Sequence, residues 1–215
     1  MNWLAIDTST EIASVALWFN DELTSLTQGN QRTHAQFLLP MIDQVLSESD
    51  AQLNQMDAIV FGRGPGSFTG LRIACSTAKG LAVSADLPVI PVSTLGAIAY
   101  SARTISGNHE ADILAVLDAR MQEVYWGFYE SDQLDTLELV SPADQIDIKN
   151  NGHLILAGVG IDLLPRTIHD EVQSSLTLYP DASAMIQLAR EMRLEPISAA
   201  LAEPVYVRNK VTHGG

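Results

Sequence analysis

Residues 58–70 read AIVFGRGPGSFTG, an apolar strand that leads into a glycine-rich turn and then into a helix. The run Ala58-Ile59-Val60-Phe61 has the β-branched and aromatic content of a buried strand. Ser67 or Thr69 is placed to cap a helix that we predict to reach about Ala85. A strand that passes through a turn into a helix is a unit of α/β folds.

The glycines of this turn, Gly62, Gly64, Gly66 and Gly70, raise the question of phosphate binding. A glycine-rich turn at a helix N-terminus exposes backbone N–H groups, which bind phosphate well. A Walker motif needs a Lys after the last glycine, and a dinucleotide fingerprint needs a glycine at position 67, which is Ser67. Neither pattern fits. The glycines then either border a ligand or are structural, supplying positive φ and close helix packing.

A strand that ends at an aspartate and continues through a polar turn into a second strand occurs twice. The two copies begin the two halves of the chain, which suggests a duplicated domain. We place the boundary in the polar stretch 106–110, so the predicted domains are residues 1–105 and 106–215, with the last residues able to pack back on the first domain. The repeated units are the strands 3–6 and 12–19 around Asp7 and the strands 113–117 and 123–129 around Asp118.

Between these units, helical and strand patterns alternate, which predicts an α/β architecture. Pro40 lies within the first helical pattern and predicts an irregular early turn or a kink there. Helices are predicted at 33–49, 67–85, 93–102 and 182–192, and further strands at 89–92, 154–157 and 205–207.

The composition describes an ordinary globular chain, with 47% hydrophobic and 18% charged residues among 215. No apolar run approaches the roughly 18 residues of a membrane span, and the start does not read as a secretory signal. The lone Cys75 excludes an internal disulfide, so we expect a cytoplasmic protein. With 12 Lys and Arg against 26 Asp and Glu, the formal charge of −14 repels phosphate backbones. If the function of the protein involves RNA, another chain should therefore hold it.

The side chains of common hydrolase sites are missing or badly spaced. No Gly-x-Ser-x-Gly elbow occurs, Ser67 has no base visible in the sequence, and Cys75 sits mid-helix among small packing residues. A helical metal site needs two histidines close together on one face, and no pair here has that spacing. We therefore predict no catalytic residue and no metal site. The histidines are His34, His109, His153, His169 and His213.

Four strings spread along the chain resemble the TsaB family, also called YeaZ: LAIDTSTEIASVAL from residue 4, GRGPGSFTGLRI from residue 62, DARMQEVYWG from residue 118 and PVYVRN from residue 204. The resemblance implies two domains of the actin-like ATPase, Hsp70 and sugar-kinase (RNase H-like) type. Each domain would have a mixed sheet flanked by helices, in agreement with the repeat.

The resemblance also implies a function. TsaB-like chains are non-catalytic scaffolds and activators of TsaD, which works with the ATPase TsaE to form N6-threonylcarbamoyladenosine at position 37 of tRNAs that read codons beginning with A. Such a chain reaches tRNA only through the complex and forms a homodimer when alone. The alternative is a free-standing ATP-dependent kinase or a peptidase of the same superfamily. Either would need a metal or phosphate site that the sequence does not display.

In that superfamily the turn after the first strand grips phosphate and its aspartate handles magnesium through water. Asp7 and Asp118 are therefore the candidates here, with Gly158 and Gly160 as candidates to border an adenosine. The turn Thr8-Ser9-Thr10 lacks the glycine that lets backbone approach a phosphate, which favours turn capping for both aspartates. We expect no cofactor bound by the chain alone, and ATP or ADP only at the joint with TsaD.

The helix after the glycine turn has one face of small residues, which allows another helix to come close. That face either packs on the chain's own sheet or meets another chain. The resemblance implies the second reading, because TsaB-like proteins bundle their two N-terminal-domain helices with TsaD or with a second copy. The predicted interface comprises Leu71, Ala74, Cys75, Ala78 and Ala82 of the helix 67–85, and Leu38, Met41, Ile42 and Val45 of the helix 33–49.

Overall fold

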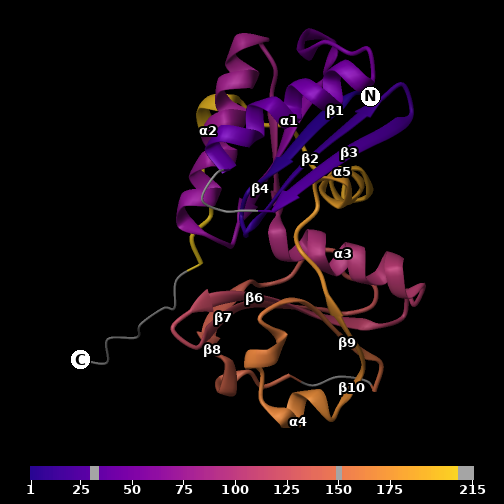
Figure 1. Cartoon of the computed structure of the whole chain (residues 1–215). Helices are drawn as coiled ribbons and strands as arrows, with labels where there is room; N and C mark the ends of the chain where they lie inside the picture. Colours follow the sequence, from indigo (N-terminus) through magenta and orange to yellow (C-terminus); the bar gives the residue numbers. More distant parts are fainter. Residues whose placement is uncertain (30–33, 149–151, 208–215) are drawn as a thin grey trace.

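The computed structural model describes residues 1–29, 34–148 and 152–207, which form two five-stranded sheets with helices around them (Figure 1). The first sheet has the order β3-β2-β1-β4-β5, in which β1 pairs antiparallel with β2 and parallel with β4. It is therefore a mixed sheet. Its strands are β1 (Trp3–Asp7), β2 (Ile12–Phe19), β3 (Glu22–Gly29), β4 (Ala58–Gly64) and β5 (Val89–Ser93).

The second sheet repeats this topology, with the order β10-β9-β6-β7-β8. Its central strand β6 pairs antiparallel with β7 and parallel with β9, as β1 pairs with β2 and β4. The repeat confirms the predicted fold class of duplicated α/β halves with mixed sheets. The strands are β6 (Asp112–Arg120), β7 (Glu123–Tyr129), β8 (Leu139–Pro142), β9 (Leu154–Val159) and β10 (Val172–Thr177).

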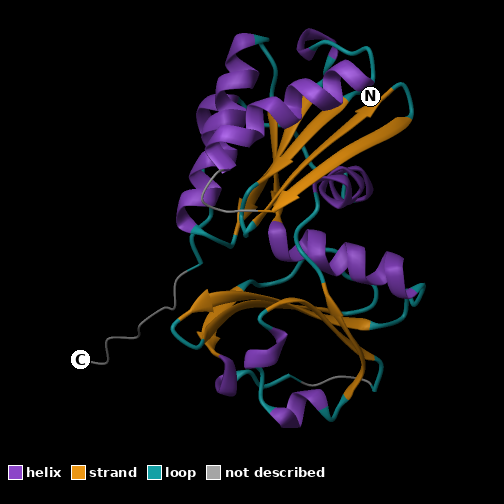
Figure 2. Ribbon diagram, viewed as in Figure 1, coloured by secondary structure: helices purple, strands orange, loops and turns teal. Residues whose placement is uncertain are grey.

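Helices cover both faces of the first sheet, and one helix lies between the sheets (Figure 2). Helices α1 (His34–Glu48) and α2 (Phe68–Ser84) pack on one face of the first sheet. Helix α5 (Ala182–Glu191) follows the second sheet in sequence but returns to the opposite face of the first. Helix α3 (Thr94–Ser106) packs its apolar side against β6 and β9 of the second sheet. The short α4 (Arg166–His169) lies beyond that sheet.

The helix boundaries follow their capping residues. Ser67 accepts a hydrogen bond from Gly70 N and begins α2, and Ser93 accepts one from Gly96 N and begins α3. Helix α3 runs four residues past its predicted end, until Gly107 adopts the left-handed conformation that ends helices. Helix α1 continues through Pro40, and its predicted first residue, Thr33, lies outside the described residues.

The predicted strand at 205–207 is not formed. This segment runs without regular secondary structure, and one backbone bond, from Val205 N to Arg63 O at 2.7 Å, ties it to the glycine turn. Just before it, Ala199 and Ala202 pack into the core that α1 and α2 share with the first sheet. The C-terminal part of the chain thus packs against the first half.

The predicted partner face of α1 and α2 lies inside the chain. All nine side chains are at most 5% exposed, and seven of them pack in one cluster with Leu4, Ile6 and Phe61 of the first sheet. The structure therefore corrects the prediction that they form a seam with another chain, because these apolar faces are buried against the chain's own sheet. The buried residues are Leu38, Met41, Ile42, Val45, Leu71, Ala74, Cys75, Ala78 and Ala82.

Candidate functional site

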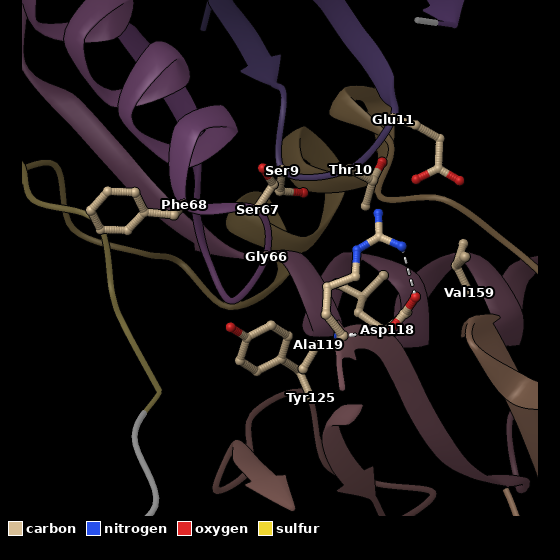
Figure 3. Close-up of a pocket in the computed structure, with 12 residues that line it drawn as sticks. Ser9, Thr10, Glu11, Gly66, Ser67, Phe68, Asp118, Ala119, Tyr125 and Val159 are labelled. Carbon is tan, nitrogen blue, oxygen red and sulfur yellow. Dashed lines mark hydrogen bonds and ion pairs between the residues drawn. The ribbon is translucent and has the colours of Figure 1, made fainter. Parts of the chain in front are cut away.

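A cleft of about 450 Å³ opens between the two halves, where β1 and β6 reach their acidic turns. Figure 3 shows Ser9 and Gly66 on the side of the first half and Asp118 and Tyr125 on the side of the second. The cleft lies where the two repeats face each other, which is where a ligand shared by both halves would bind. Its lining is Ser9, Thr10, Glu11, Gly66, Ser67, Phe68, Leu117, Asp118, Ala119, Arg120, Tyr125 and Val159.

The glycine turn packs directly on the first acidic turn. Ser67 N donates to Ser9 O, and Thr8 Oγ1 donates to Gly70 O, each at 2.7 Å. A Cβ added at Gly66 would lie 2.6 Å from Ser9 O, and one added at Gly70 would lie 1.8 Å from Thr8 O. These glycines therefore allow two backbone segments to touch, which is the structural alternative offered by the sequence.

Asp7 lies beneath this contact and does not line the cleft. Its side chain is fully buried, and Ser9 N and Ser9 Oγ donate to its Oδ1 at 3.0 and 2.7 Å. Oδ2 has no hydrogen-bond partner among the described residues and faces Gly62. Burial raises the pKa of Asp7 to about 7, and the bonds from Ser9 oppose that rise only in part. Asp7 is thus an internal turn carboxyl.

Asp118 does line the cleft, but its carboxylate is taken. Arg120 N donates to Oδ1 at 2.7 Å, and Arg120 Nη1 pairs with Oδ2 at 3.1 Å. Gly160, with φ of 97°, lies beside the Asp118 backbone, since an added Cβ would be 3.0 Å from Asp118 N. At Gly158, with φ of 127°, a Cβ would be 1.9 Å from Val116 O. The structure thus brings Asp118 and Gly160 together. Both Gly158 and Gly160 are needed for their positive φ angles and close backbone contacts, whether or not a ligand binds.

The donor set does not fit a magnesium nucleotide. One aspartate is buried away from the cleft and the other is paired with Arg120, so of these two carboxylates the cleft presents at most that of Asp118 to a metal. The first turn has no glycine, and the Gly66 backbone already occupies the space against Ser9. Within the described ranges, no three of the residues His, Cys, Asp and Glu group as metal ligands.

Several residues that line the cleft were not predicted as site residues from the sequence. Arg120 and Tyr125 come from the run DARMQEVYWG, and Phe68 is the first residue of α2. The Phe68 ring lies 5.3 Å from that of Tyr206 and beneath the Arg72 guanidinium, which is 3.9 Å away. Their only sequence signal is their position next to the acidic turn and the glycine turn.

The described histidines are scattered. His34 Nε2 bonds to Glu11 O and His169 Nε2 to Ile161 O, both at 3.2 Å, which holds each ring to its local backbone. His213 lies outside the described residues. In the portion of the chain that the structure describes, no helix is long and apolar enough to cross a bilayer.

Comparisons with known proteins agree along the chain. The family model described as "TsaD: tRNA N6-adenosine threonylcarbamoyltransferase" matches residues 28–206. The tRNA threonylcarbamoyladenosine biosynthesis protein TsaB of Haemophilus influenzae is 40% identical, with 97% of this chain and 94% of that protein covered. TsaB of Escherichia coli is 37% identical, over 98% and 96%. A solved structure of YeaZ from Pseudomonas aeruginosa superposes with a TM-score of 0.86 at 37% identity, over 96% of this chain and 99% of that one.

Proposed function

The chain belongs to the TsaB family, also called YeaZ, and from this premise we propose that it is the non-catalytic subunit that scaffolds and activates TsaD. With TsaD and the ATPase TsaE it would form N6-threonylcarbamoyladenosine at position 37 of tRNAs that read codons beginning with A. The site of action would be the cytoplasm. The proposed role is a specific part of the threonylcarbamoyladenosine biosynthesis after which the relatives are named.

The cleft supports a non-catalytic role. The superfamily's two acidic positions are occupied by internal contacts, Asp7 with Ser9 and Asp118 with Arg120. A kinase would need those carboxylates free for a metal, and a metallopeptidase would need clustered ligands. We therefore propose that the chain alone binds no nucleotide, and that any ATP or ADP of the complex sits at the joint with TsaD.

We infer that TsaD binds the outward sides of α1 and α2. The observation that supports this inference is the exposed glycine at position 80. Gly80 is exposed within α2, and a Cβ added there would meet nothing within 4 Å. An exposed glycine inside a helix costs roughly 0.5–1 kcal/mol relative to alanine, and no internal packing requires it here. A partner helix that approaches the α2 backbone would require it.

We define the outer helix face as the exposed residues on this side of the two helices. Four large apolar side chains on these two helices are 37–72% exposed, and exposed apolar groups are a feature of protein-binding surfaces. The same face could join a second copy of the chain when TsaD is missing, which would make the homodimer and the heterodimer exclude each other. The apolar members are Phe37 and Leu39 of α1 and Phe68 and Val83 of α2.

The test compares two glutamine variants in binding to TsaD of the same organism. Gly80→Gln places a long side chain on the outer helix face, and we expect at least a tenfold loss of affinity with no loss of folding. Thr104→Gln makes a similar change at an exposed position of α3 and should bind as the wild type does. Normal binding by Gly80→Gln would refute the proposed face.

Activity tests the second part of the proposal. The purified chain should transfer no threonylcarbamoyl group to tRNA and should restore transfer when added to TsaD and TsaE. Its formal charge of −14 also predicts no tRNA affinity beyond nonspecific levels at physiological salt. Transfer by a preparation free of TsaD would contradict the non-catalytic role. Tight tRNA binding by the isolated chain in a gel shift would contradict the prediction that it does not bind tRNA by itself.

A further inference from the structure

The turn between β6 and β7 has an unfavourable backbone. Arg120 pairs with Glu123 across the hairpin, so Met121 and Gln122 form a two-residue loop. Their φ angles are 53° and 65°, and Arg120 before them has a φ of 70°. Three consecutive residues with side chains thus occupy the left-handed region, which favours Gly, Asn and Asp.

The first half of the chain contains a matched turn for comparison. Between β2 and β3, Phe19 pairs with Glu22 and the loop is Asn20-Asp21, with φ of 50° and 65°. The two loops therefore have nearly the same geometry, with positive φ at both central residues as in a type I′ turn. Asn and Asp suit those positions, whereas Met and Gln do not. Folding alone gives no reason for Met-Gln at the second turn.

Met121 is also the most exposed large hydrophobic side chain among the described residues, at 93%. By contrast, Met41, Met56 and Met185 are 5%, 3% and 0% exposed. The strained turn thus projects a flexible apolar side chain into solvent. Strained backbone and exposed hydrophobic side chains both gather at functional surfaces.

We propose that Met121 is a docking side chain that inserts into an apolar pocket of the protein that binds the outer helix face. This inference rests on the proposed function, because it gives that partner a second contact at the mouth of the cleft. Thioether side chains are adaptable and suit protein-binding surfaces.

Continuity of the surface identifies the occupant. Phe68 belongs to the outer helix face, is 55% exposed, and lines the same cleft as Ala119 and Arg120, which precede Met121. Tyr206, 39% exposed, extends this apolar surface beside Phe68. A partner on α2 therefore meets the turn across the cleft, where it also passes Arg72 over the Phe68 ring and the exposed side chain of Arg120. Because the chain carries a formal charge of −14, the partner pocket should have a basic rim.

The experiment converts the turn into its favourable sequence. The double variant Met121→Asn with Gln122→Gly has the Asn-Gly pair that type I′ turns prefer, so its Tm should rise by about 3 °C or more. If Met121 docks, the same variant should bind TsaD at least tenfold more weakly. Met121→Leu keeps an apolar side chain and should bind within about threefold of the wild type. Asp21→Gly, which creates Asn-Gly in the matched turn, should raise Tm without changing affinity.

A second readout uses the wild-type chain. Hydrogen peroxide transfers one oxygen atom to a thioether sulfur and leaves as water, so exposed Met121 should become a sulfoxide. Mass spectrometry should show its oxidation slowed at least fivefold in the complex with TsaD.

The outcomes separate the two proposals. If the Asn-Gly variant binds TsaD normally while Gly80→Gln does not, the docking role of Met121 is overturned and the outer helix face stands. Equal oxidation of Met121 in the free and bound chain overturns it too, and so does a fall in Tm of the double variant. If wild-type chain and TsaD do not associate at all, the proposed function itself fails.

Discussion

A Cβ added at Gly62 would lie 1.9 Å from Oδ2 of Asp7, so the glycine turn and the first acidic turn are built against each other. Asp7 ends β1 and Gly62 lies in β4, and these two strands are parallel neighbours in the first sheet. Two strings that are far apart in the sequence thus form one packed unit. Its interior holds a carboxyl group and backbone contacts, and little space is left for a phosphate.

The first prediction compares two glycines. Gly62→Ala should destabilise the chain by about 2–3 kcal/mol, because the new methyl group overlaps the Asp7 carboxyl within a packed interior. Gly80→Ala is the control, since its Cβ meets nothing within 4 Å and it should stabilise by roughly 0.5–1 kcal/mol. Thermal unfolding followed by circular dichroism measures both. Equal effects of the two substitutions would contradict this account.

The second prediction concerns the pH dependence that Asp7 gives to stability. Its pKa is about 7 in the folded chain against 3.8 without perturbation, so between these values the folded state keeps a proton that the unfolded state releases. Stability should therefore fall as pH rises through this window and level off above about 7, by up to about 4 kcal/mol. Asp7→Asn removes this slope, while its amide oxygen can still accept from Ser9.

Urea unfolding from pH 4 to 8 tests it. The Asn variant should gain stability relative to the wild type as pH rises, and the gain should be largest at pH 8. Parallel curves for the two proteins would mean that Asp7 does not titrate in this range.

The sequence predicted the repeated hairpins because each has an apolar strand, an aspartate and a second strand. It predicted α2 because an apolar strand, a glycine turn and the cap Ser67 follow in order. These signals are local. No local signal shows whether the face around Ala78 points inward or outward, because small apolar residues suit both an internal sheet and a partner helix. Only the sheet beneath α2 decides between them.

The candidate site was predicted less well, for a similar reason. Asp7 and Asp118 occupy equivalent positions in the two sequence repeats, but one is buried beside Gly62 and the other pairs with Arg120. The partners of both carboxylates come from how the turns pack, which residue spacing does not encode. The sequence did not show the strain at Met121 either, since only the backbone reveals that Met-Gln occupies a turn type that prefers Asn-Gly.

The third prediction uses Ala78, which is fully buried against the first sheet. Ala78→Glu forces a carboxylate into an apolar core, which costs several kcal/mol, so the variant should melt early or be insoluble. Val83→Glu is the matched control on the same helix, because Val83 is 72% exposed. It should stay folded and lose binding to TsaD. A folded Ala78→Glu chain that merely failed to bind would restore the interface reading of this face.

The last prediction concerns an ion pair that joins the two halves and has a buried carboxylate. Glu138 precedes β8 of the second sheet, and its side chain is 6% exposed; Arg63 Nη2 of the glycine turn lies 3.4 Å from its Oε2. Ser93 Oγ, at the start of α3, donates to the same carboxylate. Burial raises the pKa of Glu138, while Arg63 and Ser93 counteract that rise.

Arg63→Met should therefore cost about 2–3 kcal/mol near pH 8, because it leaves a buried carboxylate without its cation. The loss should shrink toward pH 5, where Glu138 binds a proton more readily once Arg63 is gone. Glu138→Gln in the same background should recover part of the stability and remove the pH dependence, since an amide carries no charge to desolvate. A double-mutant cycle measures the coupling, which should be at least about 1 kcal/mol for residues in direct contact. Additive effects of the two substitutions at pH 8 would show that this ion pair does not contribute to holding the two halves together.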